Sequence, residues 1–173
     1  MSQRWRRMAV AALAAAACTL AAVSLHAYQA GSSAQSSQPL ATADYEVEGV
    51  EVALLSVKRV SDGTLTVKWE YRNKTDKPKE LGASFDGMGW SEPFSLVYHA
   101  YVVDARNRMK YPVLKDEKGN LVAARHAGRK VVVLGPKQTI GTWAKFAAPP
   151  ADAKKISIFI QGTQPFEEIP ISE

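Results

Sequence analysis

The sequence predicts an all-β domain, built as an antiparallel two-sheet sandwich that is immunoglobulin-like in the broad sense, with about seven to nine strands. Three observations predict it. Apolar and polar residues alternate with a period of two in several segments, turn residues separate these segments, and no long amphipathic helix pattern occurs. The strand count and spacing favour a sandwich. A small β-barrel is the alternative.

The clearest predicted strand is Thr64–Arg72, where every second residue is apolar. Side chains alternate across a strand, so one face should carry four apolar groups: Leu65, Val67, Trp69 and Tyr71. The region before it, Val47–Val60, is apolar in one phase up to Leu54 and in the opposite phase from Leu55. Such a flip predicts a β-bulge or a strand that changes sheets. Ser61-Asp62-Gly63 predicts the hairpin turn between the two regions.

Two further strands are expected around the turn Arg106-Asn107-Arg108. Leu96–Val103 is apolar in both phases and is predicted to be a central strand. Met109–Leu114 is predicted to return from the turn. Because Pro112 cannot donate a ladder hydrogen bond, this returning segment should be an edge strand.

The last third of the chain continues the pattern of short strands and turns. Lys118-Gly119-Asn120 predicts a turn, and Gly135-Pro136 predicts a hairpin between Lys130–Leu134 and Thr139–Ala147. Two more segments alternate: one contains Ile156, Ile158 and Ile160, and the other is Phe166–Ile171. Pro170 marks this last segment as another edge strand.

Residues 1–27 have the pattern of an export signal peptide. Three arginines among the first seven residues precede the uncharged, apolar Met8–Leu25, and Ala27 is a small residue suited to cleavage. We therefore expect a periplasmic or secreted protein. Two alternatives anchor the chain to a membrane: retention of the leader, or lipidation of Cys18, which follows three alanines.

Cleavage of the leader would change the composition of the chain. Cys18 is the only cysteine, so disulfides and thiolate chemistry would be excluded. Removing the three leader arginines from the 22 Lys and Arg leaves 19, against 17 Asp and Glu, a net charge of +2. This near balance argues against nucleic acid as a partner. Residues 28–44 are rich in Ser, Gln and Ala and should form a flexible tether before a domain at residues 45–173.

Several segments carry a resemblance to a known kind of protein: LTVKWEYRNKTDKP, YVVDARNRMKYPVLKDEKGN, TWAKFAAPPADAKKISIFI and PFEEIPI. They resemble exported bacterial immunoglobulin-like domains of unassigned function, some of which stand beside OmpA-like domains. The resemblance covers nearly all of Val47–Ile171 and implies a fold rather than an activity. The sequence ends at Glu173 without an OmpA-like domain, so cell-wall anchoring is not expected to follow from it.

Two segments are candidate binding sites. Ala83–Pro93 holds Phe85, Met88 and Trp90 among glycines, a composition suited to a loop that anchors a partner. The alternative is that its aromatic side chains cap the sandwich. The second segment is a basic patch for an anionic lipid, glycan or acidic protein, or else a solvated loop. It contains Arg125, His126, Arg129 and Lys130.

A metal site is the runner-up interpretation. Thioether and imidazole ligands suit copper, and the chain after the leader has four such residues: Met88, His99, Met109 and His126. Packing of these residues in the fold is the alternative. We expect no cofactor and no enzyme activity, because no nucleophile, zinc-protease or phosphate-loop motif occurs. The expected function is a non-enzymatic binding or assembly module for an envelope or extracellular protein, reached through the aromatic loop or an edge strand.

Overall fold

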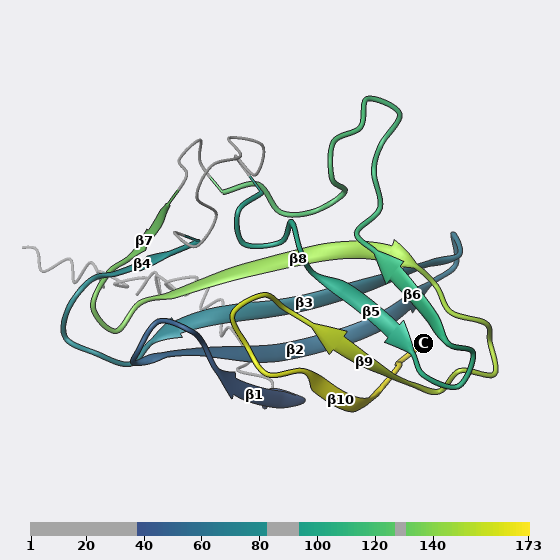
Figure 1. The fold of residues 1–173 in the computed structure, drawn as a ribbon, viewed down its shortest axis with the longest axis horizontal. Coiled ribbons are helices and arrows are strands. Elements are labelled where there is room, and N and C mark those ends of the chain that lie inside the picture. Colours follow the sequence, from purple (N-terminus) through teal and green to yellow (C-terminus); the bar gives the residue numbers. More distant parts are fainter. Residues whose placement is uncertain (1–37, 83–93, 127–130) are drawn as a thin grey trace, which may run out of the picture. The chain divides into compact units, whose positions relative to one another are not determined.

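Three antiparallel sheets make up the computed structural model, which describes residues 38–82, 94–126 and 131–173 (Figure 1). Sheet 1 has the strand order β1-β2-β3-β8, sheet 2 has the order β10-β9-β5-β6, and β4 pairs with β7 in a small ribbon. The ten strands are β1 (Ala41–Asp44), β2 (Val50–Val60), β3 (Thr64–Asn73), β4 (Lys79–Leu81), β5 (Tyr101–Asp104), β6 (Met109–Pro112), β7 (Val132–Leu134), β8 (Thr139–Ala147), β9 (Lys155–Phe159) and β10 (Phe166–Pro170).

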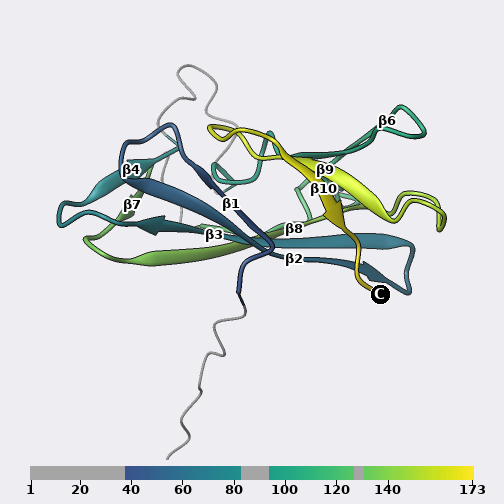
Figure 2. The ribbon, with the colours of Figure 1, turned by 90° about the horizontal axis from the view of Figure 1, so that it is seen from below.

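The predicted all-β class is confirmed, with ten strands in place of seven to nine and no helix in the described residues. Sheets 1 and 2 lie as two layers, with the β4–β7 ribbon at one end (Figure 2). Side chains of both layers fill the space between them, among them Trp69 and Phe146 from sheet 1 and Ile158 from sheet 2. Among the described residues the two sheets remain open, so the arrangement is that of a sandwich and not of a closed barrel.

Strand β3 follows its predicted alternation. Leu65, Val67, Trp69 and Tyr71 are all at most 1% exposed. The turn before β3 is also confirmed: Asp62 Oδ1 accepts a hydrogen bond from the Thr64 backbone N–H at 3.0 Å, and Gly63 takes the positive φ of 77° that the turn requires.

A β-bulge interrupts β2 where the apolar phase flips. The register with β3 shifts between Leu54 and Ser56, which leaves Leu55 unpaired. Leu54 and Val57 are both buried as a result, although they lie an odd number of residues apart. Of the two predicted explanations, the bulge is the one observed.

The bulge also divides the edge of β2 that faces away from β3. Residues Glu51–Leu54 pair with β1. Beyond the bulge, Ser172 donates from its backbone N–H to Val57 O at 2.9 Å, and Arg59 N–H donates to Ser172 O at 2.8 Å. One long strand therefore holds both the first strand and the last residues of the domain.

The predicted central strand Leu96–Val103 is wrong over its first half. Phe94–Ala100 forms consecutive turns, in which Phe94 O accepts from Val97 N–H at 2.9 Å and from Tyr98 N–H at 3.0 Å. Only Tyr101–Asp104 is a strand. The segment is apolar in both phases because Leu96 and Val97 both point into the core from a turn, a pattern that period alone does not distinguish from a buried strand.

The hairpin predicted at Gly135-Pro136 is also wrong in its pairing. The turn exists, since Gln138 N–H donates to Gly135 O at 3.2 Å. Its flanking strands, however, lie in different sheets: β7 pairs with β4, and β8 pairs with β3. One edge of β8 pairs with β3 over nine register positions, so β7 cannot pair with that edge of β8.

The fold begins earlier than predicted. Strand β1 lies within the range expected as tether, so this part of the tether prediction is corrected by its pairing with β2. The compact unit of which it is part is Ser36–Glu173. Beyond β1, Glu46 N–H donates to Gly162 O at 2.6 Å, so the chain passes from sheet 1 to the connection between β9 and β10.

Both predicted edge strands are confirmed as the edges of sheet 2, since β6 and β10 are its outermost strands. The free edge of β6 is short. Just after Pro112, Val113 bridges Phe146 of β8, and Leu114 N–H donates to Lys145 O at 2.8 Å.

A buried asparagine joins β3 to the ribbon. Asn73 is 3% exposed. Its side-chain Nδ2 donates to Lys77 O at 2.7 Å and to Gly135 O at 2.9 Å. Its Oδ1 accepts from the Thr75 backbone N–H at 2.9 Å. One side chain thus satisfies backbone groups on both sides of the β4–β7 ribbon.

We expect Asn73→Ala to lower the free energy of unfolding by about 2–4 kcal/mol, because buried carbonyl groups lose their donor. Urea denaturation measures this. Asn120→Ala is the matched control, since Asn120 makes its hydrogen bonds in an exposed turn. A loss at Asn73 no greater than that of the control would contradict the role given to this residue.

Candidate functional site

Described residues next to the two segments that were predicted separately as binding sites pair with one another. In the ribbon, Leu81 at the end of β4 pairs with Val132 at the start of β7. Residues 83–93 follow β4 almost at once, and residues 127–130 end just before β7. The antiparallel register therefore sets a residue that shortly precedes the aromatic segment beside a residue that shortly follows the basic segment.

A second contact joins described residues on the other side of the two segments. Phe94 directly follows residues 83–93, and Arg125 shortly precedes residues 127–130. The Arg125 guanidinium carbon lies 5.4 Å from the centroid of the Phe94 ring. This is the range of a cation–π interaction. We call these two contacts, the Leu81–Val132 pair and the Phe94–Arg125 contact, the anchor cluster.

The anchor cluster is attached to the core. Phe94 is 7% exposed and Leu81 is fully buried, while Arg125 is exposed. Of the residues predicted as binding groups, Phe85, Met88, Trp90, Arg129 and Lys130 lie outside the described residues.

His126, predicted as part of the basic patch, is a buried residue. It is 9% exposed, and its Nε2 lies 3.0 Å from Thr142 Oγ1 of β8. Burial lowers its pKa, because the charged imidazolium loses hydration there. Its position favours the neutral form over the cation that the basic-patch prediction implied.

The residues of the alternative metal set are not gathered where they are described. Met109 pairs with Asp104 at one end of β5, whereas His99 precedes Tyr101 at the other end, and the strand between them is about 10 Å long. His99 is exposed and its ring makes an edge contact with Tyr98. Among the described residues, no group of three His, Cys, Asp or Glu lies close enough to hold a metal ion. Met88 lies outside them, so copper binding stays a prediction.

A groove of about 300 Å³ opens where β5 and β9 diverge beyond the Val103–Ser157 pair. Its charged lining residues are largely engaged with one another. Arg106 Nη1 lies 3.5 Å from Asp152 Oδ2, and Lys155 Nζ lies 3.1 Å from Glu168 Oε2. The buried Asp104 carboxylate accepts from Asn107, with Oδ2 at 2.7 Å from Asn107 Nδ2. The Asp104–Asn107 contact closes the turn after β5, and the Lys155–Glu168 contact joins β9 to β10.

Sequence reasoning missed an exposed tryptophan. Trp143 of β8 is 38% exposed on the side of sheet 1 that faces away from sheet 2. The signal was present in the sequence: Trp143 stands in the polar phase of β8 with Thr139 and Lys145, opposite to the phase of the buried Ala144 and Phe146.

Comparison with protein-family models, with curated protein sequences and with solved structures finds no match. The resemblance to exported bacterial immunoglobulin-like domains therefore stays a prediction. Within residues 38–82, 94–126 and 131–173, no helix has the length and apolar character needed to cross a membrane.

The depressed pKa of His126 predicts a stability that falls on acidification. The unfolded chain takes up a proton near pH 6.5, while the folded protein resists it, so stability is fully present above about pH 6.5 and is lost as the pH falls toward the folded-state pKa. Urea denaturation at pH 7.5 and pH 5.5 measures the loss.

The variant His126→Gln should show a smaller loss of stability between these two pH values than the unmodified protein. His99→Gln is the control, because it removes an exposed histidine and keeps His126. Equal pH dependence in all three proteins would show that His126 does not titrate differently in the folded state.

Proposed function

We propose that this protein is an exported, non-enzymatic binding module that engages a protein partner of the bacterial envelope. The observation that carries the proposal is the anchor cluster, in which the described residues that flank an aromatic segment contact described residues that flank a basic segment. Aromatic and arginine side chains are the residues that most often dominate the energy of protein interfaces.

The location of this cluster supports the proposal. Leu81 and Phe94, which stand on either side of the aromatic segment, are packed in the core, and a rigid scaffold lowers the entropy cost of presenting a binding loop. The export signal pattern supports an envelope partner. With the leader removed the net charge is small, which favours a specific surface over general attraction to a polyanion.

The edge strand β6 is a second route for the same function. Met109 is 51% exposed there, and an edge strand can accept a strand from a partner. Pro112 and the bridge at Val113 shorten the edge, however. The Lys110 Nζ lies 3.7 Å above the Tyr101 ring on the neighbouring strand. These features make the anchor cluster the better supported route.

We expect Trp90→Ala and Arg125→Glu each to weaken capture of one and the same envelope protein by about tenfold or more, since central aromatic and arginine contacts contribute most to such interfaces. The measurement is affinity capture by the purified protein, with the captured protein identified and its affinity then measured by calorimetry. Lys118→Glu, in the exposed turn beyond Lys115, is the matched charge-reversal control.

Unchanged affinity in both Trp90→Ala and Arg125→Glu would overturn the anchor cluster as the site. If Met109→Asp alone abolished the affinity, the partner would bind at β6. Unfolding midpoints of every variant separate loss of binding from loss of fold.

A further inference from the structure

The outer face of sheet 1 carries an exposed aromatic residue among small and charged neighbours. The register of β3 with β8 places Lys68 opposite Trp143 and Glu70 opposite Gly141. On the other side of β8, Ala124 N–H donates to Trp143 O at 2.8 Å. We call Lys68, Glu70, Ala124, Gly141 and Trp143 the tryptophan face.

The space beside the Trp143 ring is open on the side of small residues. Gly141 lies two positions before Trp143 on the same face, and a Cβ built on it meets no atom within 4 Å. Ala124 on the adjoining segment also contributes only a methyl group. An indole beside a glycine and an alanine, with no side chain above the glycine, offers a surface on which the face of a small ring can stack.

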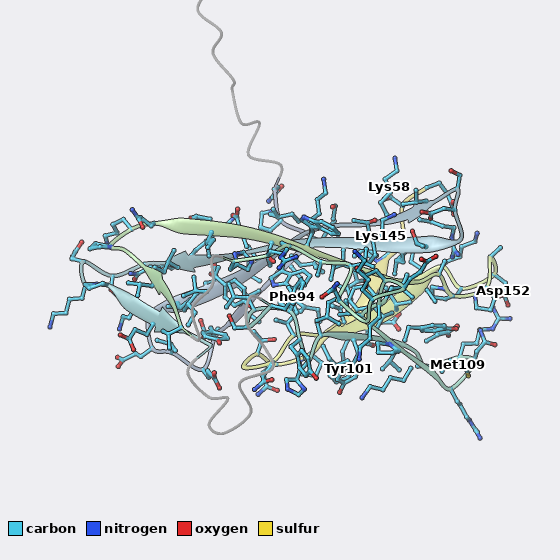
Figure 3. The ribbon with its side chains drawn as sticks, turned by 90° about the horizontal axis from the view of Figure 1, so that it is seen from above. Lys58, Phe94, Tyr101, Met109, Lys145 and Asp152 are labelled. Atoms are coloured by element: carbon cyan, nitrogen blue, oxygen red, sulfur yellow. The ribbon has the colours of Figure 1, made fainter. Side chains whose placement is uncertain are left out.

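The charge on this face is positive. The outward positions of β2, β3 and β8 include Lys58, Lys68 and Lys145 as well as Arg72. In Figure 3 the labelled Lys58 and Lys145 lie on the side of sheet 1 away from Phe94 and Tyr101.

The acidic groups of the face are already engaged. Glu70 Oε1 lies 2.6 Å from Arg72 Nε, and Glu51 Oε1 lies 3.4 Å from Arg72 Nη1. In the part of the chain that the structure describes, Lys58 and Lys68 form no ion pair. Lys68, directly opposite Trp143, and Lys58, on β2 two strands from Trp143, thus stay available for an anionic ligand.

We propose that the tryptophan face binds an acidic polysaccharide. A sugar ring would stack on Trp143 above Gly141, and a carboxylate of the polysaccharide would pair with Lys68. Lys58, on the adjacent strand β2, would be the next cation that the polysaccharide meets. A flat face suits an extended polymer, and a few placed polar groups beside an aromatic surface fix the orientation of such a ligand. This site is separate from the anchor cluster and does not depend on the proposed protein partner.

The composition of the face distinguishes this ligand from a lipid bilayer. Insertion into the interfacial region of a bilayer needs a broad apolar surface. Trp143 instead has Lys68 opposite it, Glu70 and Thr66 diagonally across from it, and Lys145 two residues farther along β8, all of them polar or charged.

The test is binding of the purified protein to sodium alginate, a polyuronate, by affinity electrophoresis at physiological salt, with neutral dextran as the comparison. We expect retardation by alginate and not by dextran. Trp143→Ala should weaken binding about tenfold through loss of stacking. Gly141→Val places a side chain in the open space beside Trp143, where there is room for it. It should weaken binding to a similar degree and leave the unfolding midpoint unchanged.

Val133→Ala is the matched control, because Val133 is an exposed apolar residue on the ribbon, 54% exposed, and should leave binding unchanged. Absence of alginate binding overturns the proposal. So does binding that Lys68→Glu weakens but Trp143→Ala and Gly141→Val do not, since charge alone would then explain it. Binding to phosphatidylglycerol vesicles in place of alginate also overturns it. If Gly141→Val does not fold, Trp143→Ala decides the question alone.

Discussion

The β-bulge at Leu55 is the constraint on which the arrangement of the sandwich depends. A strand of eleven residues without it would turn either Leu54 or Val57 toward solvent. With the bulge, both are buried, and the outer edge of β2 is divided between β1 and Ser172. The same strand therefore pairs with β3 along its length and holds the two ends of the folded unit, which links sheet 1 to the segment that leaves sheet 2.

Two surfaces of different construction lie on this framework. Leu81 and Val132 of the anchor cluster lie in the β4–β7 ribbon, which Asn73 holds against β3 through hydrogen bonds to backbone carbonyls. The tryptophan face lies on the outer side of β3 and β8 and needs only the regular register of these two strands. Hydrogen bonds such as those of Asn73 support the elements from which loops extend. The regular pairing of β3 with β8 instead produces an extended flat surface.

The sequence predicted the local features of the candidate sites better than their relations in space. It placed Phe85–Trp90 and Arg125–Lys130 in separate loops, and only the tertiary structure shows that described residues flanking them are in contact. It grouped His126 with cations, whereas the contact with Thr142 and burial favour a neutral ring. It did not distinguish Trp143 from the core aromatics, although its phase along β8 separates it from Phe146.

By itself the sequence determined the all-β class, the alternation in β3, the phase flip in β2, the turns and the two edge strands, because each depends on neighbours within a few residues. The tertiary structure alone decided that β7 pairs with β4 and not with β8, and that Phe94–Ala100 is a turn although its residues are apolar in both phases. Strand pairing joins residues far apart in the chain, and burial depends on what lies opposite, so neither is encoded in a local period.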